Sequence, residues 1–139
     1  METFAETAPA YLRDAQFSDF TIVCGAKEYK VHRVIISSHS KYLARCCSGD
    51  FQEAMTHRVE LQEDDPAAIA RMIEYFYKFD YEDREDTANA TENTIQINAI
   101  VLVAAEKYDV QGLKLLAREK YKTACSSKRH DSMALAKAA

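Results

Sequence analysis

The fold is decided by the stretch from Phe17 to Met55, which reads FSDFTIVCGAKEYKVHRVIISSHSKYLARCCSGDFQEAM. Apolar residues alternate along 20–24, a turn follows at Gly25, and a second extended run ends at Val31. Alternation with a period of two places one apolar face on each run, so we expect a β-hairpin.

The pattern changes to helical spacing after the hairpin. A short apolar run at 34–36 is followed by polar serines. Ser40 stands where its side chain can cap a second helix, and the apolar positions of that helix are Leu43, Cys46 and Cys47. The chain is therefore expected to pass from the hairpin directly into a pair of helices.

The order of these pieces resembles a BTB/POZ domain. The pattern of that family begins with F-x-D, which is followed by an apolar hairpin. An apolar residue before H-R or H-K comes next. A serine followed by an aromatic-apolar pair, and then an aromatic-x-E, complete the pattern. The matching segments are Phe17-Ser18-Asp19, Val31-His32-Arg33, Ser40-Lys41-Tyr42-Leu43 and Phe51-Gln52-Glu53. The likeness covers about residues 4 to 124.

The resemblance implies an α+β fold with a short three-stranded sheet packed on a cluster of five to six helices. It divides the chain into an N-terminal helix at 1–16, which is a candidate dimer arm, and a BTB/POZ core at 17–124. The core contains an acidic, solvated loop at 80–94. Residues 125–139 form a C-terminal extension, expected to be flexible or to begin a truncated region.

The N-terminal segment carries an apolar stripe with helical spacing and a proline within it. Pro9 fits only the first turn of a helix, so with Thr7 as N-cap the helix is expected to run to about Ala15 and to leave Phe4 outside. The spacing fits a helix that packs on its own domain as well as it fits a dimer surface. In BTB relatives this helix crosses a two-fold axis, and the resemblance implies interface residues Ala8, Tyr11, Leu12 and Val34.

The rest of the chain predicts one more strand and three helices. The strand lies at 58–61, and Asp65 with Pro66 begins an amphipathic helix. The most apolar helix spans 97–108. Asp109 is expected to cap the last helix, and Ser126-Ser127 is expected to break it.

Composition excludes several classes of function. The net charge of −4 disfavours a nucleic-acid surface, which needs clustered Lys and Arg. No apolar run approaches the ~20 residues that span a bilayer, and the N-terminus lacks the features of a signal peptide. We therefore expect a cytoplasmic or nuclear protein without a membrane or nucleic-acid partner.

No site for catalysis, metal or cofactor is expected. Cys24, His32, His39 and Cys46 lie seven or eight residues apart, whereas structural zinc ligands come in closely spaced pairs. The cysteines fall mostly in apolar patterns, which favours buried thiols in a reducing compartment. The resemblance implies that His32 and Asp19 are structural residues of the buried framework around the hairpin.

The function implied by the resemblance is protein–protein interaction as a homodimer. Phe51 and Glu53 match the apolar-x-Glu of cullin-binding relatives, so they are candidates for a cullin groove and for an adaptor of a cullin-RING ubiquitin ligase. The alternatives are the oligomerising domain of a transcriptional regulator and a stand-alone scaffold. An enzyme is not expected, because the sequence offers no catalytic constellation.

Overall fold

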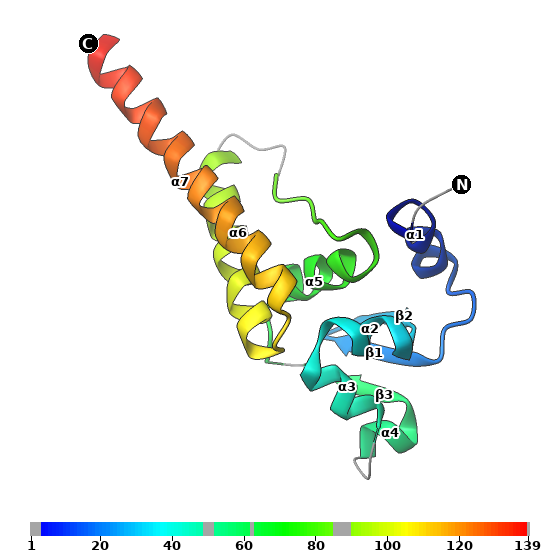
Figure 1. Cartoon of the computed structure of the whole chain (residues 1–139). Helices are drawn as coiled ribbons and strands as arrows, with labels where there is room; N and C mark the ends of the chain where they lie inside the picture. The colour runs from blue at the N-terminus through cyan, green and yellow to red at the C-terminus, as the bar shows by residue number, and fades with distance from the viewer. Residues whose placement is uncertain (1–3, 49–51, 62, 85–89, 139) are drawn as a thin grey trace.

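The computed structural model describes residues 4–48, 52–61, 63–84 and 90–138, and Figure 1 shows their arrangement. These residues form three strands and seven helices, so the expected α+β class is confirmed, with one helix more than the five to six expected. In chain order the elements are α1 (Phe4–Asp14), β1 (Phe20–Cys24), β2 (Lys27–Val31), α2 (Arg33–His39), α3 (Lys41–Cys47), α4 (Gln52–Thr56), β3 (Arg58–Glu60), α5 (Pro66–Lys78), α6 (Ala90–Lys107) and α7 (Gln111–Ala138).

The sheet has the order β2-β1-β3, with β1 in the middle. The expected hairpin is confirmed, because β1 and β2 pair antiparallel with Ile22 opposite Tyr29, and Gly25 turns the chain with φ of +60°. Strand β3 pairs parallel to β1 and places Val59 opposite Ile22. Helices α2, α3 and α4 form the crossover connection that a parallel pair requires.

Two predicted helix caps are present. The Ser40 hydroxyl accepts a hydrogen bond from the Leu43 backbone N–H at 3.0 Å, and it donates one to the Tyr108 carbonyl at 2.6 Å, which ties α3 to the end of α6. The Asp65 carboxylate accepts from the Ala67 N–H at 2.9 Å, with Pro66 as the first residue of α5. Each cap satisfies a backbone donor that the helix itself leaves unpaired.

The apolar stripe of α5 forms the centre of the core, as its spacing predicts. Its side chains are at most 1% exposed, and the residues are Ile69, Met72, Ile73, Phe76 and Tyr77. Helix α5 lies between α1 on one side and the α6–α7 pair on the other (Figure 1).

The last helix differs from its prediction at both ends. Asp109 does not cap it, because Asp109 lies in the left-handed region with φ of 54° and the helix begins at Gln111. The predicted break at Ser126-Ser127 is wrong, since α7 continues through both serines to Ala138 and extends past α6 (Figure 1). Ala124 is still buried just before the serines, so packing of the helix carries it across two residues of weaker helix propensity.

The first helix begins earlier than predicted. It starts at Phe4 and not after Thr7, so Pro9 lies inside it and removes one helical N–H. The Phe4 ring contacts Phe79 at the end of α5 edge-on, with 5.5 Å between ring centroids, and Ala8 is buried in the core. These contacts with α5 stabilise an additional turn that the local signals did not indicate.

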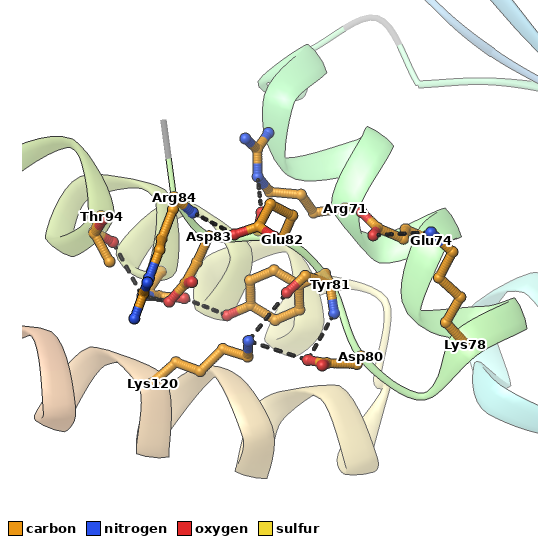
Figure 2. Close-up of polar contacts among 11 residues, drawn as sticks. Arg71, Glu74, Lys78, Asp80, Tyr81, Glu82, Asp83, Arg84, Thr94 and Lys120 are labelled. Atoms are coloured by element: carbon orange, nitrogen blue, oxygen red, sulfur yellow. Dashed lines mark hydrogen bonds and ion pairs between the residues drawn. The ribbon is translucent and has the colours of Figure 1, made fainter. Parts of the chain in front are cut away.

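The described parts of the acidic stretch, 80–84 and 90–94, are more ordered than expected. Tyr81 is only 2% exposed, and residues from Ala90 onward already belong to α6. Lys120 of α7 donates a hydrogen bond to the Tyr81 carbonyl at 3.0 Å, contacts the Asp80 carboxylate at 3.0 Å, and lies over the Tyr81 ring (Figure 2). Among the described residues, the expected solvated loop is therefore wrong at Tyr81, whose buried ring holds 80–84 on α7, and from Ala90 onward, which is helical, whereas 85–89 lie outside the described residues.

Asn98 of α6 adds a second set of contacts to the segment that Lys120 holds. It is fully buried, accepts a hydrogen bond from the Tyr81 hydroxyl, and donates to the Asp83 carboxylate at 2.9 Å and to the Thr94 carbonyl at 3.0 Å. Burial raises the pKa of Tyr81 above its usual value, and the nearby Asp83 and Asp80 charges raise it further. Two of the acids in the segment are thus paired within the domain.

His32 connects three separate parts of the chain. Its Nε2 lies 2.6 Å from the Gln16 carbonyl, and its Nδ1 lies 2.8 Å from the Tyr77 hydroxyl of α5. A carbonyl only accepts, so Nε2 carries the hydrogen and the Tyr77 hydroxyl donates to Nδ1. Burial raises the pKa of Tyr77 to about 12, so this hydroxyl keeps its proton, and it also accepts from the His32 backbone N–H at 3.1 Å.

His39 fills an aromatic cluster that links α2 to α5 and α1. Its ring stacks on Phe76 and meets Tyr75 and Phe79 edge-on, and Phe79 in turn contacts Phe4. Its Nε2 donates to the Phe76 carbonyl at 3.0 Å. Burial lowers the pKa of His39 below 6.5, although the bond to Phe76 acts in the opposite direction.

Loss of the hydrogen bonds between His32, Tyr77 and Gln16 is expected to destabilise the domain; we call these three residues the His32 node. His32→Leu leaves the Tyr77 hydroxyl and Gln16 carbonyl without their partner, and Tyr77→Phe leaves His32 Nδ1 without its donor. Each is expected to lower the free energy of unfolding by about 1–3 kcal/mol in chemical denaturation. The matched variant Tyr121→Phe, at an exposed tyrosine of α7, should change it by less than about 0.5 kcal/mol. A wild-type midpoint for Tyr77→Phe would contradict this role.

Stability is expected to fall as the solution is acidified through the range where His39 titrates. Below pH 6.5 the unfolded chain takes up a proton at this imidazole before the folded chain does, so unfolding becomes more favourable as pH decreases. His39→Gln cannot titrate, and its free energy of unfolding should depend less steeply on pH between about 7 and 5.5 than that of the wild type. Equal slopes in denaturation curves across this range would show that His39 contributes nothing to the dependence.

Candidate functional site

The first candidate surface lies on α1 and α2. Of the four residues expected at a dimer interface, Tyr11 is 40% exposed and Val34 is 78% exposed. Leu12 packs partly against the core, and Ala8 is only 2% exposed, so it belongs to the domain's own interior. One side of α1 therefore packs on α5, while the Tyr11 ring on the other side is partly exposed to solvent; the dimer surface stays a prediction.

Asp19 and Arg33 form a polar pair close to this surface. The Asp19 carboxylate accepts from the Arg33 backbone N–H at 2.7 Å and from its guanidinium at 3.1 Å. His32 stands at the N-cap of α2 without a capping side-chain bond, so Asp19 serves the first residue of that helix from across the hairpin. Partial burial opposes ionisation of Asp19, but the two bonds from Arg33 outweigh it and lower the pKa of this carboxyl.

The two residues expected in the buried framework differ in their surroundings. His32 is 7% exposed and hydrogen-bonded on both ring nitrogens. The side chain of Asp19 is 42% exposed, so Asp19 lies at the rim of the framework and not inside it. A carboxylate that caps a helix from a strand end keeps one side in water, which explains the difference.

Sequence reasoning missed Phe17 as part of this surface. Phe17 is 75% exposed, and its ring centroid lies 6.1 Å from that of Tyr11. It precedes β1 outside any periodic stripe, so neither helical nor strand spacing could assign it a face. The sequence marked Phe17 only as the first residue of the F-x-D segment, which says nothing about its exposure.

The second candidate surface lies around α3 and α4. Phe51 lies outside the described residues, whereas Glu53 lies in α4, half-buried. Part of the segment between α3 and β3 is helical and forms α4. Burial raises the pKa of Tyr42 of α3, and Cys46 and Glu53 raise it further.

Exposed side chains accompany Glu53 on this part of the domain. Met55 is 78% exposed and Tyr42 is 37% exposed, with the Tyr42 ring edge-on to Tyr108 at 5.0 Å between centroids. Lys107 and Tyr108 both bind the Asp64 carboxylate, which fixes the end of α6 beneath Tyr42. This part of the domain thus carries exposed Met55 and Tyr42 together with the carboxylates of Glu53 and Asp64.

The described residues contain no cluster of His, Cys, Asp and Glu that could hold a metal ion. Cys24 and Cys46 are buried, and burial raises the pKa of Cys46 to about 11, so this thiol stays protonated and unreactive at neutral pH. Among the helices that the structure describes, none has the length and apolar character to cross a membrane.

Similar proteins were found by sequence. Kelch-like protein 5 of Homo sapiens is 29% identical over 94 residues, which are 66% of this chain and 12% of that protein. TD and POZ domain-containing protein 5 of Mus musculus is 23% identical over 103 residues, which are 74% of this chain and 28% of that protein. The chain spans about an eighth of the first of these relatives and under a third of the second.

A solved structure and a family model agree on the fold. The BTB domain of zebrafish PATZ1 superimposes with a TM-score of 0.66 over 86% of this chain and 88% of that one, at 12% identity, so this likeness concerns the fold alone. The model of the BTB/POZ domain matches residues 10–124, most of the chain. Both the match to the family model and the arrangement of hairpin, parallel third strand and helical cluster lead to one conclusion: the chain belongs to the BTB/POZ domain family.

Proposed function

We propose that this protein-interaction module acts as a homodimer and as an adaptor for a cullin-type ubiquitin ligase scaffold. The observation that carries the dimer is the exposure of apolar side chains on α1 and α2, led by Val34 at 78%. A two-fold interface uses the same patch of both copies, so every contact occurs twice.

The charges near this patch support self-association. Asp19 and Arg33 are each 42% exposed, so an acid and a base stand side by side at the surface. A patch with both signs is complementary to its own copy when one copy is turned by 180°. This arrangement favours a second copy of the chain over a partner of a single charge.

The cullin part of the proposal rests on Phe51-Gln52-Glu53 and on the likeness to Kelch-like proteins. Glu53 is half-buried in α4, the helix that also carries the exposed Met55, so a carboxylate acceptor and an apolar side chain belong to one short element. That combination suits an amphipathic helix that lays its apolar face into a groove. A helix of a cullin N-terminal domain is the proposed occupant.

Val34→Asp is expected to convert the dimer into a folded monomer. The change places two buried charges in each dimer while it touches an exposed side chain in the monomer, so the melting temperature of the monomer should stay near that of the wild type. Analytical ultracentrifugation across micromolar concentrations measures the effect. Val103→Asp, at a 65% exposed valine of α6, is the matched control and should leave the dimer intact. A wild-type chain that sediments as a monomer at tens of micromolar would remove the proposal.

Phe51→Ala is expected to weaken binding to a cullin N-terminal domain by about ten- to a hundredfold, since burial of a Phe side chain contributes roughly 1.5–3 kcal/mol. Glu53→Ala should weaken it less, because a partly exposed charge contact is typically worth under about 1 kcal/mol. Calorimetry measures both affinities, and the melting temperature of each variant is recorded beside them.

The control for this pair is Glu119→Ala, at an exposed acid on α7. It should bind like the wild type. Unchanged melting with lost binding supports docking at this surface, whereas a marked drop in the melting temperature of Phe51→Ala assigns that ring to the core. No heat of binding from a properly folded dimer would leave a generic oligomerising module, as in the regulator or scaffold alternatives.

A further inference from the structure

Phe17 is held in an unusual backbone conformation. Its φ is +63°, in the left-handed region that residues with a Cβ disfavour, and its side chain is 75% exposed. The Phe17 ring lies tilted against that of Tyr11, with 6.1 Å between ring centroids, and most of its surface faces solvent. An unfavourable backbone that presents an apolar ring to water needs a reason on the outside of the molecule.

Hydrogen bonds to neighbouring residues fix the turn that carries Phe17. Ala15 is also left-handed, with φ of 56°, and its carbonyl accepts from the Ser18 N–H at 3.2 Å. Between the two left-handed residues, the Gln16 carbonyl accepts from His32 Nε2 at 2.6 Å. The buried His32 imidazole therefore holds the Gln16 carbonyl, which lies in the middle of the turn.

We propose that Phe17 anchors the contact between two copies of this chain, and that His32 is the positioning residue that keeps its ring presented. This rests on the proposed homodimer and adds to it a residue outside both helices of the interface. The same turn leads into Asp19, whose pairing with Arg33 gives the surface its two signs of charge. The anchor and the charge pair thus lie on one continuous stretch of chain, which supports a second copy as the occupant.

The test compares dimer dissociation constants from sedimentation with unfolding midpoints of the same variants. Phe17→Ala removes two anchoring rings from each dimer, so the dissociation constant should rise about a hundredfold or more while the folded chain melts like the wild type. Met55→Ala is the matched control, because Met55 is 78% exposed on α4, away from α1 in Figure 1. It should leave the dissociation constant unchanged.

The role of His32 is tested through a double-mutant cycle. His32→Leu should raise the dissociation constant at least tenfold, and His32→Leu with Phe17→Ala should dimerise no more weakly than Phe17→Ala alone, because His32 acts through Phe17. A merely structural histidine would lower stability and give additive effects on dimerisation. His32→Gln, which keeps an N–H donor, should restore part of the affinity. If His32→Leu does not fold, Tyr77→Phe takes its place in the cycle.

The outcomes separate the two levels of the proposal. A monomeric wild type overturns the dimer and this inference together. A dimer that Val34→Asp abolishes and Phe17→Ala leaves at wild-type affinity overturns the anchor and preserves the dimer. Additive effects in the cycle overturn the positioning role of His32 and preserve Phe17 as an anchor.

Discussion

The hydrogen bonds of one buried imidazole set the arrangement of the N-terminal half of this domain. His32 ends the hairpin, begins α2, and binds a hydroxyl of α5 and a carbonyl of the turn before β1. Only a side chain with a donor and an acceptor at opposite ends of a rigid ring can join these groups in this way. Because Tyr77 is protonated and Gln16 offers only a carbonyl, the tautomer of His32 follows from its partners. Within the residues described, no buried side-chain nitrogen or oxygen is left without a hydrogen bond, which is what a low-dielectric interior requires.

Local signals in the sequence predicted those parts of the fold that depend on local chemistry. Ser40 and Asp65 have the side chains that satisfy unpaired N–H groups, and both cap their helices. The alternation in β1 and the stripe of α5 identify buried faces because a half-buried strand or helix must segregate its apolar residues. The likeness to BTB/POZ domains supplied the order of these elements. Local signals do not show that β3 pairs parallel to β1, because this pairing depends on the crossover through α2, α3 and α4.

The predictions that were wrong concern segments that depend on distant contacts. Pro9 and Ser126 both suggest a helix boundary, yet packing on α5 and on the domain body outweighs the local cost. Tyr81 stands in a strongly acidic stretch, and composition cannot show that its ring is covered by Lys120 and met by a buried asparagine of another helix. The candidate surfaces could be outlined from the sequence, but burial of Ala8 and exposure of Phe17 required the three-dimensional arrangement.

The distribution of polar and apolar groups indicates where binding energy can come from. Surface ion pairs such as those of Arg58 with Glu28 are half-exposed, and pairs of this kind are typically worth under about 1 kcal/mol, so they contribute orientation more than affinity. The acids of the 80–84 segment are partly engaged by Lys120 and Asn98 within the domain. Exposed apolar side chains such as Met55, Val103 and Leu115 lie elsewhere on the domain, and the apolar area that the proposed dimer would use lies at the turn and helices around His32. In a two-fold complex this area is buried twice, so a few side chains suffice for a stable interface, provided that a rigid support holds them in place before association. For the proposed dimer, the hydrogen bonds of His32 to the Gln16 carbonyl and the Tyr77 hydroxyl are the candidate support.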